Sequence, residues 1–261
     1  MSWWGKVLGG AFGFMLGGPL GAVLGAAFGH QFDKGVKGLD REAFAPGDTE
    51  RVQLAFFTAT FSVMGHMAKA DGQVTRDEIA LAEAVMARMD LAPQMRKAAV
   101  KLFDQGKQAD FPLDDVLDQF RREAHRRRNL LRMFLEIQLQ AALADGHLHV
   151  AERRVLEQVC DRLGLARAEL EALEAAFRAE RHHQNTRPTQ RPVLADAYAI
   201  LGVDAEASDA EVKRAYRRLL SQHHPDKLVA KGLPEEMMKL ATQKTHEIRQ
   251  AYEAVREARG F

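Results

Sequence analysis

Cysteine is almost absent from this chain, because Cys160 is the only one among 261 residues. A single cysteine excludes an intramolecular disulfide and a zinc site built from several thiolates, and it is typical of a reducing compartment. The residue lies in an apolar helical run with Val155, Leu156, Val159 and Leu163. The spacing therefore favours a packed core thiol over a reactive one.

The chain also has little surplus of charge of either sign. Lys and Arg together number 37, Asp and Glu number 36, and the formal net charge is +1. A nearly neutral chain gives no reason to expect nucleic acid as a partner of the whole molecule, so any basic surface must be local. No nucleophile–base set and no glycine-rich phosphate loop is visible, so we expect neither an enzyme nor a bound cofactor.

Charged residues are missing from Val7 to Gly29. As one helix this run is about 34 Å long, enough to cross a hydrocarbon core of about 30 Å. Trp3 and Trp4 precede it, where an aromatic belt would lie. We predict a transmembrane anchor over residues 1–31 and a connector over 32–50. A cleavable signal peptide is the alternative, although the run is longer than a usual signal core.

Basic residues flank the apolar run unequally. Lys6 stands alone before it, whereas Lys34, Lys37, Arg41 and Arg51 follow. The positive-inside rule therefore predicts one span of the inner membrane, with a short periplasmic N-terminus and a cytoplasmic remainder.

Glycine recurs at every fourth position of this segment: Gly5, Gly9, Gly13, Gly17, Gly21, Gly25 and Gly29. On an α-helix these positions form an inclined groove, which favours close helix–helix contact and, most simply, a homodimer. A monomeric span of biased composition is the alternative. Pro19 is expected to kink the span, and a hairpin turning at residues 17–19 is also open.

The middle of the chain is predicted to be an all-helical domain over residues 51–179, and it contains a repeat. Segments 68–89 and 141–163 both run from a helix through Ala-Asp-Gly into a second helix. The matched residues are Asp71, Gly72 and Glu78 in the first copy and Asp145, Gly146 and Glu152 in the second. Glycine helix ends and a Thr75–Glu78 capping box explain the pattern structurally. The alternative is a divalent cation held by the acidic residues, although the ligand ladder of an EF-hand is missing.

These paired corners in an all-helical domain resemble the TerB-like tellurite-resistance fold. The matched acidic residues of that family have been associated with metal, so the resemblance supports the cation alternative. His147 and His149 are expected to be exposed loop residues.

Two polar segments complete the middle region. Arg121–Arg132 is rich in arginine, and we predict a solvated helix face there, with phosphate binding as the alternative. Residues 180–193 contain Pro188 and Pro192, show no apolar periodicity and are predicted to be a linker.

The C-terminal residues 194–261 are predicted to form a helical hairpin. A short helix from Asp196 ends at Gly202, and a Ser208–Glu211 capping box begins a second helix that runs to about His223. Its apolar stripe is Val212, Ala215, Tyr216 and Leu219, and Lys213, Arg214, Arg217 and Arg218 lie off that stripe. Pro225 ends the helix, residues 224–227 form a loop, and a long third helix follows. The stripe of that helix is Met237, Leu240, Ala241, Ile248, Ala251, Tyr252 and Val255.

The segments DAYAILGV, KRAYRRL, HHPDK and IRQAYEAV, in this order, resemble a J-domain of DnaJ-type co-chaperones. The resemblance implies that this hairpin docks on an ATP-bound DnaK-type chaperone and stimulates its ATP hydrolysis. The residues implied to bind DnaK are Lys213, Arg214, Arg217, Arg218, His224, Pro225, Asp226 and Lys227. No glycine/phenylalanine-rich stretch and no CxxC repeat follows, so the client-binding parts of a general DnaJ are missing.

The order of anchor, helical domain and J-domain is similar to the family of membrane-anchored DnaJ-like co-chaperones of Gram-negative bacteria. The resemblance implies a stress-related co-chaperone, a client held by the central domain, and links to a capsule-regulating envelope phosphorelay. The linker is shorter and poorer in Gly and Gln than that family leads us to expect. The alternative function is a metal-responsive membrane stress sensor with the J-domain as its output.

Overall fold

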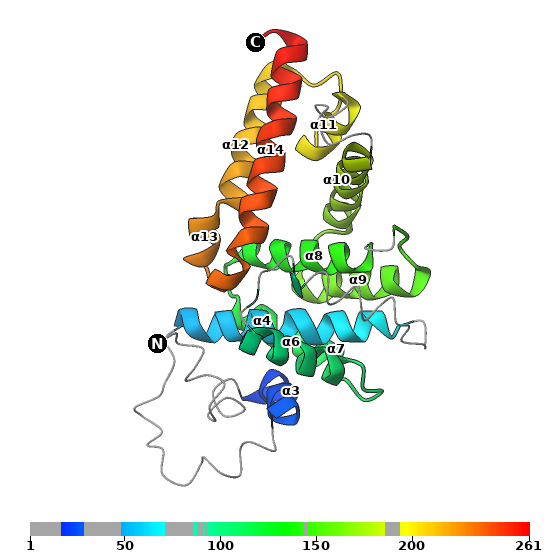
Figure 1. Ribbon diagram of the computed structural model, residues 1–261, viewed down its shortest axis with the longest axis vertical. Coiled ribbons are helices and arrows are strands. Elements are labelled where there is room, and N and C mark those ends of the chain that lie inside the picture. Colours follow the sequence, from blue (N-terminus) through cyan, green and yellow to red (C-terminus); the bar gives the residue numbers. More distant parts are fainter. Residues whose placement is uncertain are drawn as a thin grey trace.

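The computed structural model describes residues 17–28, 48–70, 86–87, 91, 93–143, 146–185 and 194–261. Within these ranges the fold is all-α, and no strand occurs (Figure 1). The α-helices are α3 (Gly18–Phe28), α4 (Asp48–Ala68), α6 (Pro93–Gly106), α7 (Leu113–Glu123), α8 (Arg128–Ala142), α9 (Val150–Leu163), α10 (Arg167–Asn185), α11 (Leu194–Leu201), α12 (Asp209–His223), α13 (Pro225–Val229) and α14 (Met238–Arg259). A 3₁₀ turn, η2 (Glu235–Met237), precedes α14.

Helix α4 is the centre of the larger domain. Its side chains are buried on all sides over most of its length, because α3, α6, α7, α8 and α9 all contact it. Phe56 meets Phe120 and Phe134 edge to face, with ring centroids 5.9 and 6.2 Å away. An apolar helix with neighbours on every side needs no polar face. This helix agrees with the all-helical character predicted for this part of the chain.

Two glycines bring α4 and α6 into backbone contact. A Cβ atom added to Gly65 would lie 2.0 Å from the carbonyl oxygen of Phe103, and one added to Gly106 would lie 1.8 Å from that of Ser62. No side chain fits at either distance, so the crossing depends on glycine at both positions.

The described part of the apolar N-terminal run forms α3, which packs on the central domain. Its helix begins at Gly18 instead of passing through it, because Gly17 and Gly18 have φ values of +58° and +57°. Leu20, Val23 and Leu24 are buried against α4, α6 and α7. In the described residues, no helix is long and apolar enough to cross a membrane. Residues 1–16 and 29–47, which complete the predicted anchor and connector, lie outside the described ranges.

The buried side chain of Gln119 on α7 holds the start of α3. Its Oε1 accepts a hydrogen bond from the backbone N–H of Leu20 at 2.9 Å, and its Nε2 donates to the carbonyl of Gly17 at 3.0 Å. One amide group thus satisfies a free helix-end donor and the carbonyl before it.

The sequence predicted one solvated helix face over the arginine-rich segment Arg121–Arg132, but the structure divides this segment between two helices. Helix α7 ends at Glu123 and α8 begins at Arg128, and Arg126 between them has a φ of +60°. Arg128 forms an ion pair with Glu169 of α10, so part of the cluster ties helices together.

Helix α10 includes the first residues of the predicted linker. It continues to Asn185 because Ala179 and Glu180 are buried against the C-terminal helices. Residues 186–193 lie outside the described ranges.

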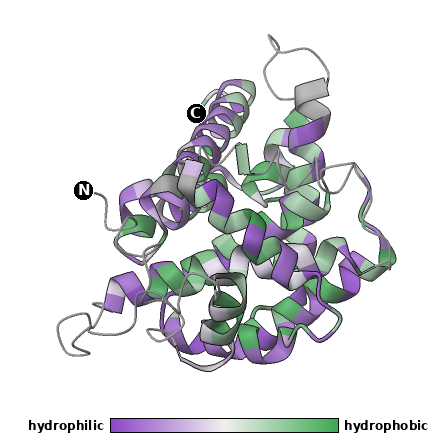
Figure 2. Ribbon diagram, turned by 60° about the horizontal axis from the view of Figure 1, so that its bottom comes forward, coloured by the Kyte–Doolittle hydropathy of each residue, from purple (hydrophilic) through white to green (hydrophobic). Residues whose placement is uncertain are grey.

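The C-terminal helices form the predicted hairpin, with α12 and α14 side by side and α11 packed against α10 and α14 (Figure 1). Figure 2 shows that most helices carry both hydrophilic and hydrophobic residues, as expected of amphipathic elements around shared cores. The end of the hairpin that contacts α11 has a core separate from that of the central domain, whereas the tip around α13 packs into the central domain. Five residues of the tip belong to the core of the central domain: Leu228, Leu233, Met237, Leu240 and Ala241.

Candidate functional site

Helix α12 is positioned by a capping box and an apolar stripe, as predicted. The N–H of Glu211 donates to Ser208 Oγ at 3.3 Å, and the N–H of Ser208 donates to Glu211 Oε2 at 2.8 Å. Ser208 Oγ also donates to Glu211 Oε2 at 2.7 Å, and this bond, together with that from the Ser208 N–H, lowers the pKa of the Glu211 carboxyl. Val212, Ala215 and Leu219 are buried. The basic residues Lys213, Arg214, Arg217 and Arg218 are exposed in one stripe on the opposite side.

The predicted loop over residues 224–227 is largely a short helix. Pro225 is the first residue of α13, where its fixed φ suits a helix start and its missing N–H costs no hydrogen bond. The N–H of Leu228 donates to the carbonyl of His224 at 3.0 Å, and that of Ala230 donates to Asp226 at 2.9 Å. The prediction of a loop is therefore wrong for residues 225–227, which belong to α13.

The side chains of His224, Asp226 and Lys227 are exposed, and Pro225 is half-buried. Lys227 donates from Nζ to Ser221 Oγ at 2.9 Å, across the bend between α12 and α13. The structure thus brings this motif and the basic stripe of α12 together on one accessible surface, which we call the docking surface: residues 213, 214, 217, 218 and 224–227.

Aromatic contacts keep the far end of the hairpin rigid. Tyr216 of α12 and Tyr252 of α14 stack with ring centroids 4.0 Å apart, and Lys213 Nζ lies 4.4 Å from the ring centroid of Phe261. Arg259 donates to Tyr198 Oη at 2.6 Å and to the Asp209 carboxylate at 3.1 Å, and these bonds raise the pKa of Arg259.

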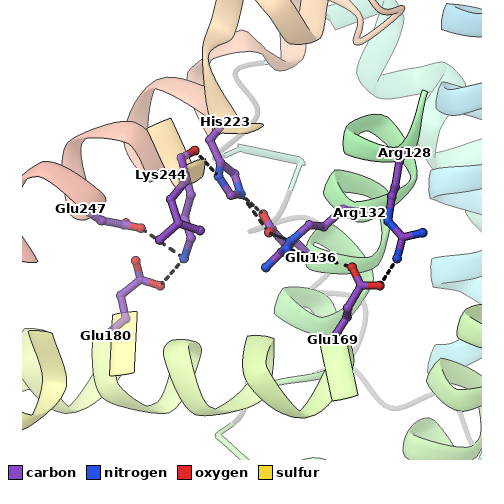
Figure 3. Close-up of polar contacts among 9 residues, drawn as sticks. Arg128, Arg132, Glu136, Glu169, Glu180, His223, Lys244 and Glu247 are labelled. Atoms are coloured by element: carbon purple, nitrogen blue, oxygen red, sulfur yellow. Dashed lines mark hydrogen bonds and ion pairs between the residues drawn. The ribbon is translucent and has the colours of Figure 1, made fainter. Parts of the chain in front are cut away.

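The residue immediately before the motif contacts the central domain (Figure 3). The ring of His223 places Nδ1 3.0 Å from the carbonyl oxygen of Leu219, and Nε2 2.9 and 3.1 Å from the two oxygens of Glu136 on α8. Both residues are buried, with 3% and 6% exposure. The Leu219 carbonyl only accepts hydrogen bonds, so Nδ1 donates to it, and Nε2 lies within hydrogen-bond distance of both carboxylate oxygens of Glu136.

The charges around Glu136 keep it ionised. Burial acts to raise the pKa of its carboxyl, but the charge and hydrogen bond of His223, with Lys244 and Arg132, outweigh burial and bring the pKa to about 2. Arg132 Nε lies 3.5 Å from Glu136 Oε1 on the same helix.

A second polar contact joins the same two domains. Lys244 Nζ of α14 lies 3.4 Å from Glu180 of α10 and 3.6 Å from Glu247 (Figure 3). Between the two contacts lies a cavity of about 290 Å³, lined by residues of both domains that include Arg132, Leu173, Arg218 and His223.

The candidate metal ligands are only partly described. Asp71, Glu78 and Asp145 lie outside the described residues, and Glu152 accepts a hydrogen bond from the backbone N–H of His149 at 2.9 Å. In the described part of the chain, no group of three or more His, Cys, Asp or Glu side chains could hold a metal ion. Gly146 has the predicted positive φ, at +103°, but α8 ends at Ala142 with Leu143 as its C-cap, so Gly146 lies in the corner after the helix end. His147 and His149 are exposed, as expected.

Of the glycines predicted to pair two chains, only Gly17, Gly21 and Gly25 are described. Gly21 is buried against the central domain, and an added Cβ at Gly17 or Gly25 would meet no atom within 4 Å. Gly5, Gly9, Gly13 and Gly29 lie outside the described residues.

The contact between His223 and Glu136 was missed from the sequence, although two signals for it exist. His223 follows Leu219 by four positions and so falls on the apolar stripe of α12. Glu136 is the one acidic residue in the apolar run from Met133 to Leu139. A charged residue within an apolar stripe indicates a buried partner, but it does not say which.

Three protein-family models match successive parts of the chain. Residues 1–42 match the co-chaperone DjlA transmembrane domain, residues 57–175 match the tellurite resistance protein TerB, and residues 196–259 match the DnaJ domain.

Curated relatives match over the full length. A co-chaperone protein DjlA of Photobacterium profundum is 47% identical over 276 residues and covers 99% of both chains. Proteins of the same name from Coxiella burnetii and Vibrio cholerae are 46% and 45% identical and cover 100% of both chains. No solved structure matches the chain.

Proposed function

The chain belongs to the DjlA family of co-chaperones, and on this premise we propose that its J-domain docks on an ATP-bound DnaK-type chaperone and stimulates ATP hydrolysis by that partner. The observation that carries the proposal is the docking surface, where exposed His224 and Asp226 adjoin the exposed basic stripe of α12. The three arginines and the lysine of the stripe steer an acidic partner surface, and Asp226 accepts a charge-assisted hydrogen bond from that partner. The chemical step takes place on the partner.

The test is the steady-state ATPase rate of DnaK with the full chain in detergent micelles. Asp226→Asn and His224→Gln remove a charge and a ring from exposed positions, so the fold is kept. We expect both variants to lose at least nine-tenths of the stimulation, while Glu206→Gln, an exposed charge of the same hairpin away from the docking surface, keeps it. Equal stimulation by wild type and Asp226→Asn would overturn the proposal.

We further propose that residues 1–42 anchor the chain in the inner membrane with the J-domain on the cytoplasmic side, and that α3 leaves its contacts with α4, α6 and α7 when this segment inserts. The family model for this segment and the excess of basic residues after the apolar run support it. A Ser2→Cys variant in intact cells should react with a maleimide that cannot cross the inner membrane. Because native Cys160 is buried, it contributes little background. Labelling only after the inner membrane is broken would contradict this orientation.

The glycine repeat supports the proposal of a homodimer through the anchor. Gly9→Leu with Gly13→Leu leaves Gly21 and its contact with the central domain intact. We expect this variant to lose dimer crosslinks in membranes and to keep DnaK stimulation in detergent. Undiminished crosslinks would show that the repeat does not mediate the contact.

The family resemblance extends the proposal to a client in envelope signalling. Expression of a capsule operon should rise on overproduction of the wild-type chain and stay at the basal level with Asp226→Asn. An equal response to both proteins would separate this output from DnaK.

A further inference from the structure

The His224–Asp226 motif lies at the junction of two domains, and the central domain supports it from both sides. Before the motif, the ring of His223 meets Glu136 of α8. After the motif, Leu228 and Leu233 are buried in the core of the central domain, at 1% and 0% exposure. The motif therefore does not sit on a free hairpin tip.

His223 is fixed at three points. Its two ring nitrogens face Leu219 and Glu136, and its backbone carbonyl accepts a hydrogen bond from Thr245 Oγ1 of α14 at 3.1 Å. The next residue, His224, has extended backbone angles, and Pro225 then restricts its own φ. Few torsions are left free between His223 and Asp226, so the direction of the motif follows from the placement of His223.

The second support is a close steric fit. Gly232, with a φ of +97°, approaches Val52 of α4 so closely that an added Cβ would lie 2.6 Å from Val52 Cγ1. The segment that follows α13 is thus pressed against the start of α4. The side chains of His224 and Asp226 stay exposed in this arrangement, so the contact between domains presents the motif and does not cover it.

We propose that Glu136 is a positioning residue for the J-domain: by holding His223, it fixes the orientation in which the His224–Asp226 motif meets its DnaK-type partner. This inference rests on the proposed function. A buried ion pair adds little net stability compared with apolar side chains of the same volume, but it is directional. Here the ion pair fixes the position of His223 at the end of α12, and this position sets the bend between α12 and α13 that carries the motif.

The expected consequence is a change in affinity. A motif that is ordered before binding loses less conformational entropy when the partner docks. Without the carboxylate charge, the ring of His223 loses its ionic contact with α8, and the orientation of the motif must be set during binding. We therefore expect Glu136→Gln to raise the concentration for half-maximal DnaK stimulation about tenfold and to leave the maximal rate unchanged, because the docked complex is the same.

The experiment titrates DnaK with the full chain in detergent micelles and uses four variants. Glu136→Gln and His223→Gln remove each partner, and their combination completes a double-mutant cycle. Glu174→Gln is the matched control, because Glu174 is a buried glutamate at 5% exposure whose partner, Arg153, lies within the central domain. We expect the double variant to resemble either single one and Glu174→Gln to resemble wild type. Thermal unfolding of each variant identifies any that has lost its fold.

Amide hydrogen exchange supplies a readout that does not depend on DnaK. Glu136→Gln should accelerate exchange at residues 226–233 at least tenfold and leave α4 and α14 unchanged, whereas Glu174→Gln should leave residues 226–233 protected.

The outcomes separate this inference from the proposed function. If Asp226→Asn is inactive while Glu136→Gln matches wild type in half-maximal concentration, the inference is overturned and the proposed function stands. Stronger stimulation by Glu136→Gln would mean that the contact inhibits the motif, which also overturns it. The inference is also overturned if the half-maximal concentration of the double variant rises by the product of the two increases seen for Glu136→Gln and His223→Gln, because two residues that act through one contact do not act independently. No stimulation by wild type would overturn the proposed function itself.

Discussion

Two buried ionisable side chains are held in opposite states, one charged and one neutral. Glu136 is kept ionised by His223, Lys244 and Arg132, whereas burial, with the nearby charges of Asp161 and Glu169, raises the pKa of the Cys160 thiol to about 12. The difference follows from their neighbours, since positive groups surround the first and apolar side chains the second.

The pKa of Glu136 predicts how stability depends on pH. Its folded pKa of about 2 lies below the ordinary glutamate pKa of 4.5, so its contribution is complete well above pH 4.5 and is lost as pH falls toward and through 2. We expect about 2 kcal/mol of this contribution to be lost between pH 6 and pH 3. Urea unfolding of wild type and Glu136→Gln at both pH values measures it, since the variant lacks this share of the pH dependence. Identical losses in both proteins would contradict the assignment.

Cys160 should be unreactive in the folded chain. With a pKa of about 12, only about one thiol in ten thousand is ionised at pH 8, and the side chain is buried. We expect no maleimide labelling over hours in buffer and rapid labelling in urea. Fast labelling without urea would show that α9 opens readily.

At the level of helices, the crossing of α4 and α6 is the most sensitive contact. Gly65→Ala or Gly106→Ala forces a backbone shift, and we expect each to lower the free energy of unfolding by about 2 kcal/mol or more. Gly25→Ala is the matched control, because its Cβ meets no atom within 4 Å and alanine is the better helix former. Chemical unfolding of the three variants makes the comparison, and equal stabilities would refute the close contact.

The attachment of α3 should depend on Gln119. Removing its amide in Gln119→Ala leaves the N–H of Leu20 and the carbonyl of Gly17 without these partners. We expect hydrogen exchange of α3 to accelerate at least tenfold. Gln108→Ala serves as control, since that side chain is exposed and donates to the carbonyl of Asp104 in its own segment. An unchanged exchange rate in Gln119→Ala would mean that apolar contacts alone hold α3.

Helices whose signals are local could be predicted from the sequence. The capping box of α12, its apolar stripe and the glycine after α11 all depend on residues a few positions apart. Other features depend on distant partners. Gln119 holds the start of α3 from 99 residues away, and the hairpin buries the end of α10. No periodicity reports such contacts, which explains why the predicted linker began too early.

At the scale of the whole molecule, the two domains share a core. Apolar residues of the hairpin tip and the ion pairs Glu136–His223 and Glu180–Lys244 join them. The members of the docking surface were predicted from the sequence, because the J-domain motif is local, and their binding to DnaK stays a proposal. The contact between Glu136 and His223, which lies next to that surface, was not predicted, because Glu136 lies 87 residues from His223 in the chain.

The shared core predicts that the domains stay together after the chain is cut. A protease site inserted within residues 187–192 allows cleavage between them. We expect the two fragments to elute together in gel filtration at neutral pH, because their contacts are buried and continuous. Wild-type chain treated with the same protease is the control, and separation of the cut fragments would contradict a joint core.

The tip residues of the hairpin have a consequence for recombination between J-domain proteins. Leu228, Leu233 and Met237 serve the hairpin and its neighbour at once, so the J-domain is not an interchangeable module of this chain. A J-domain transplanted from another co-chaperone brings its own docking motif but not the apolar tip residues that pack on the central domain. Such a chimera should work only when the acquired tip also carries the apolar side chains and the histidine that α4 and α8 accept. Gene fusion and domain shuffling are thereby restricted to donors whose hairpin tip also fits the central domain.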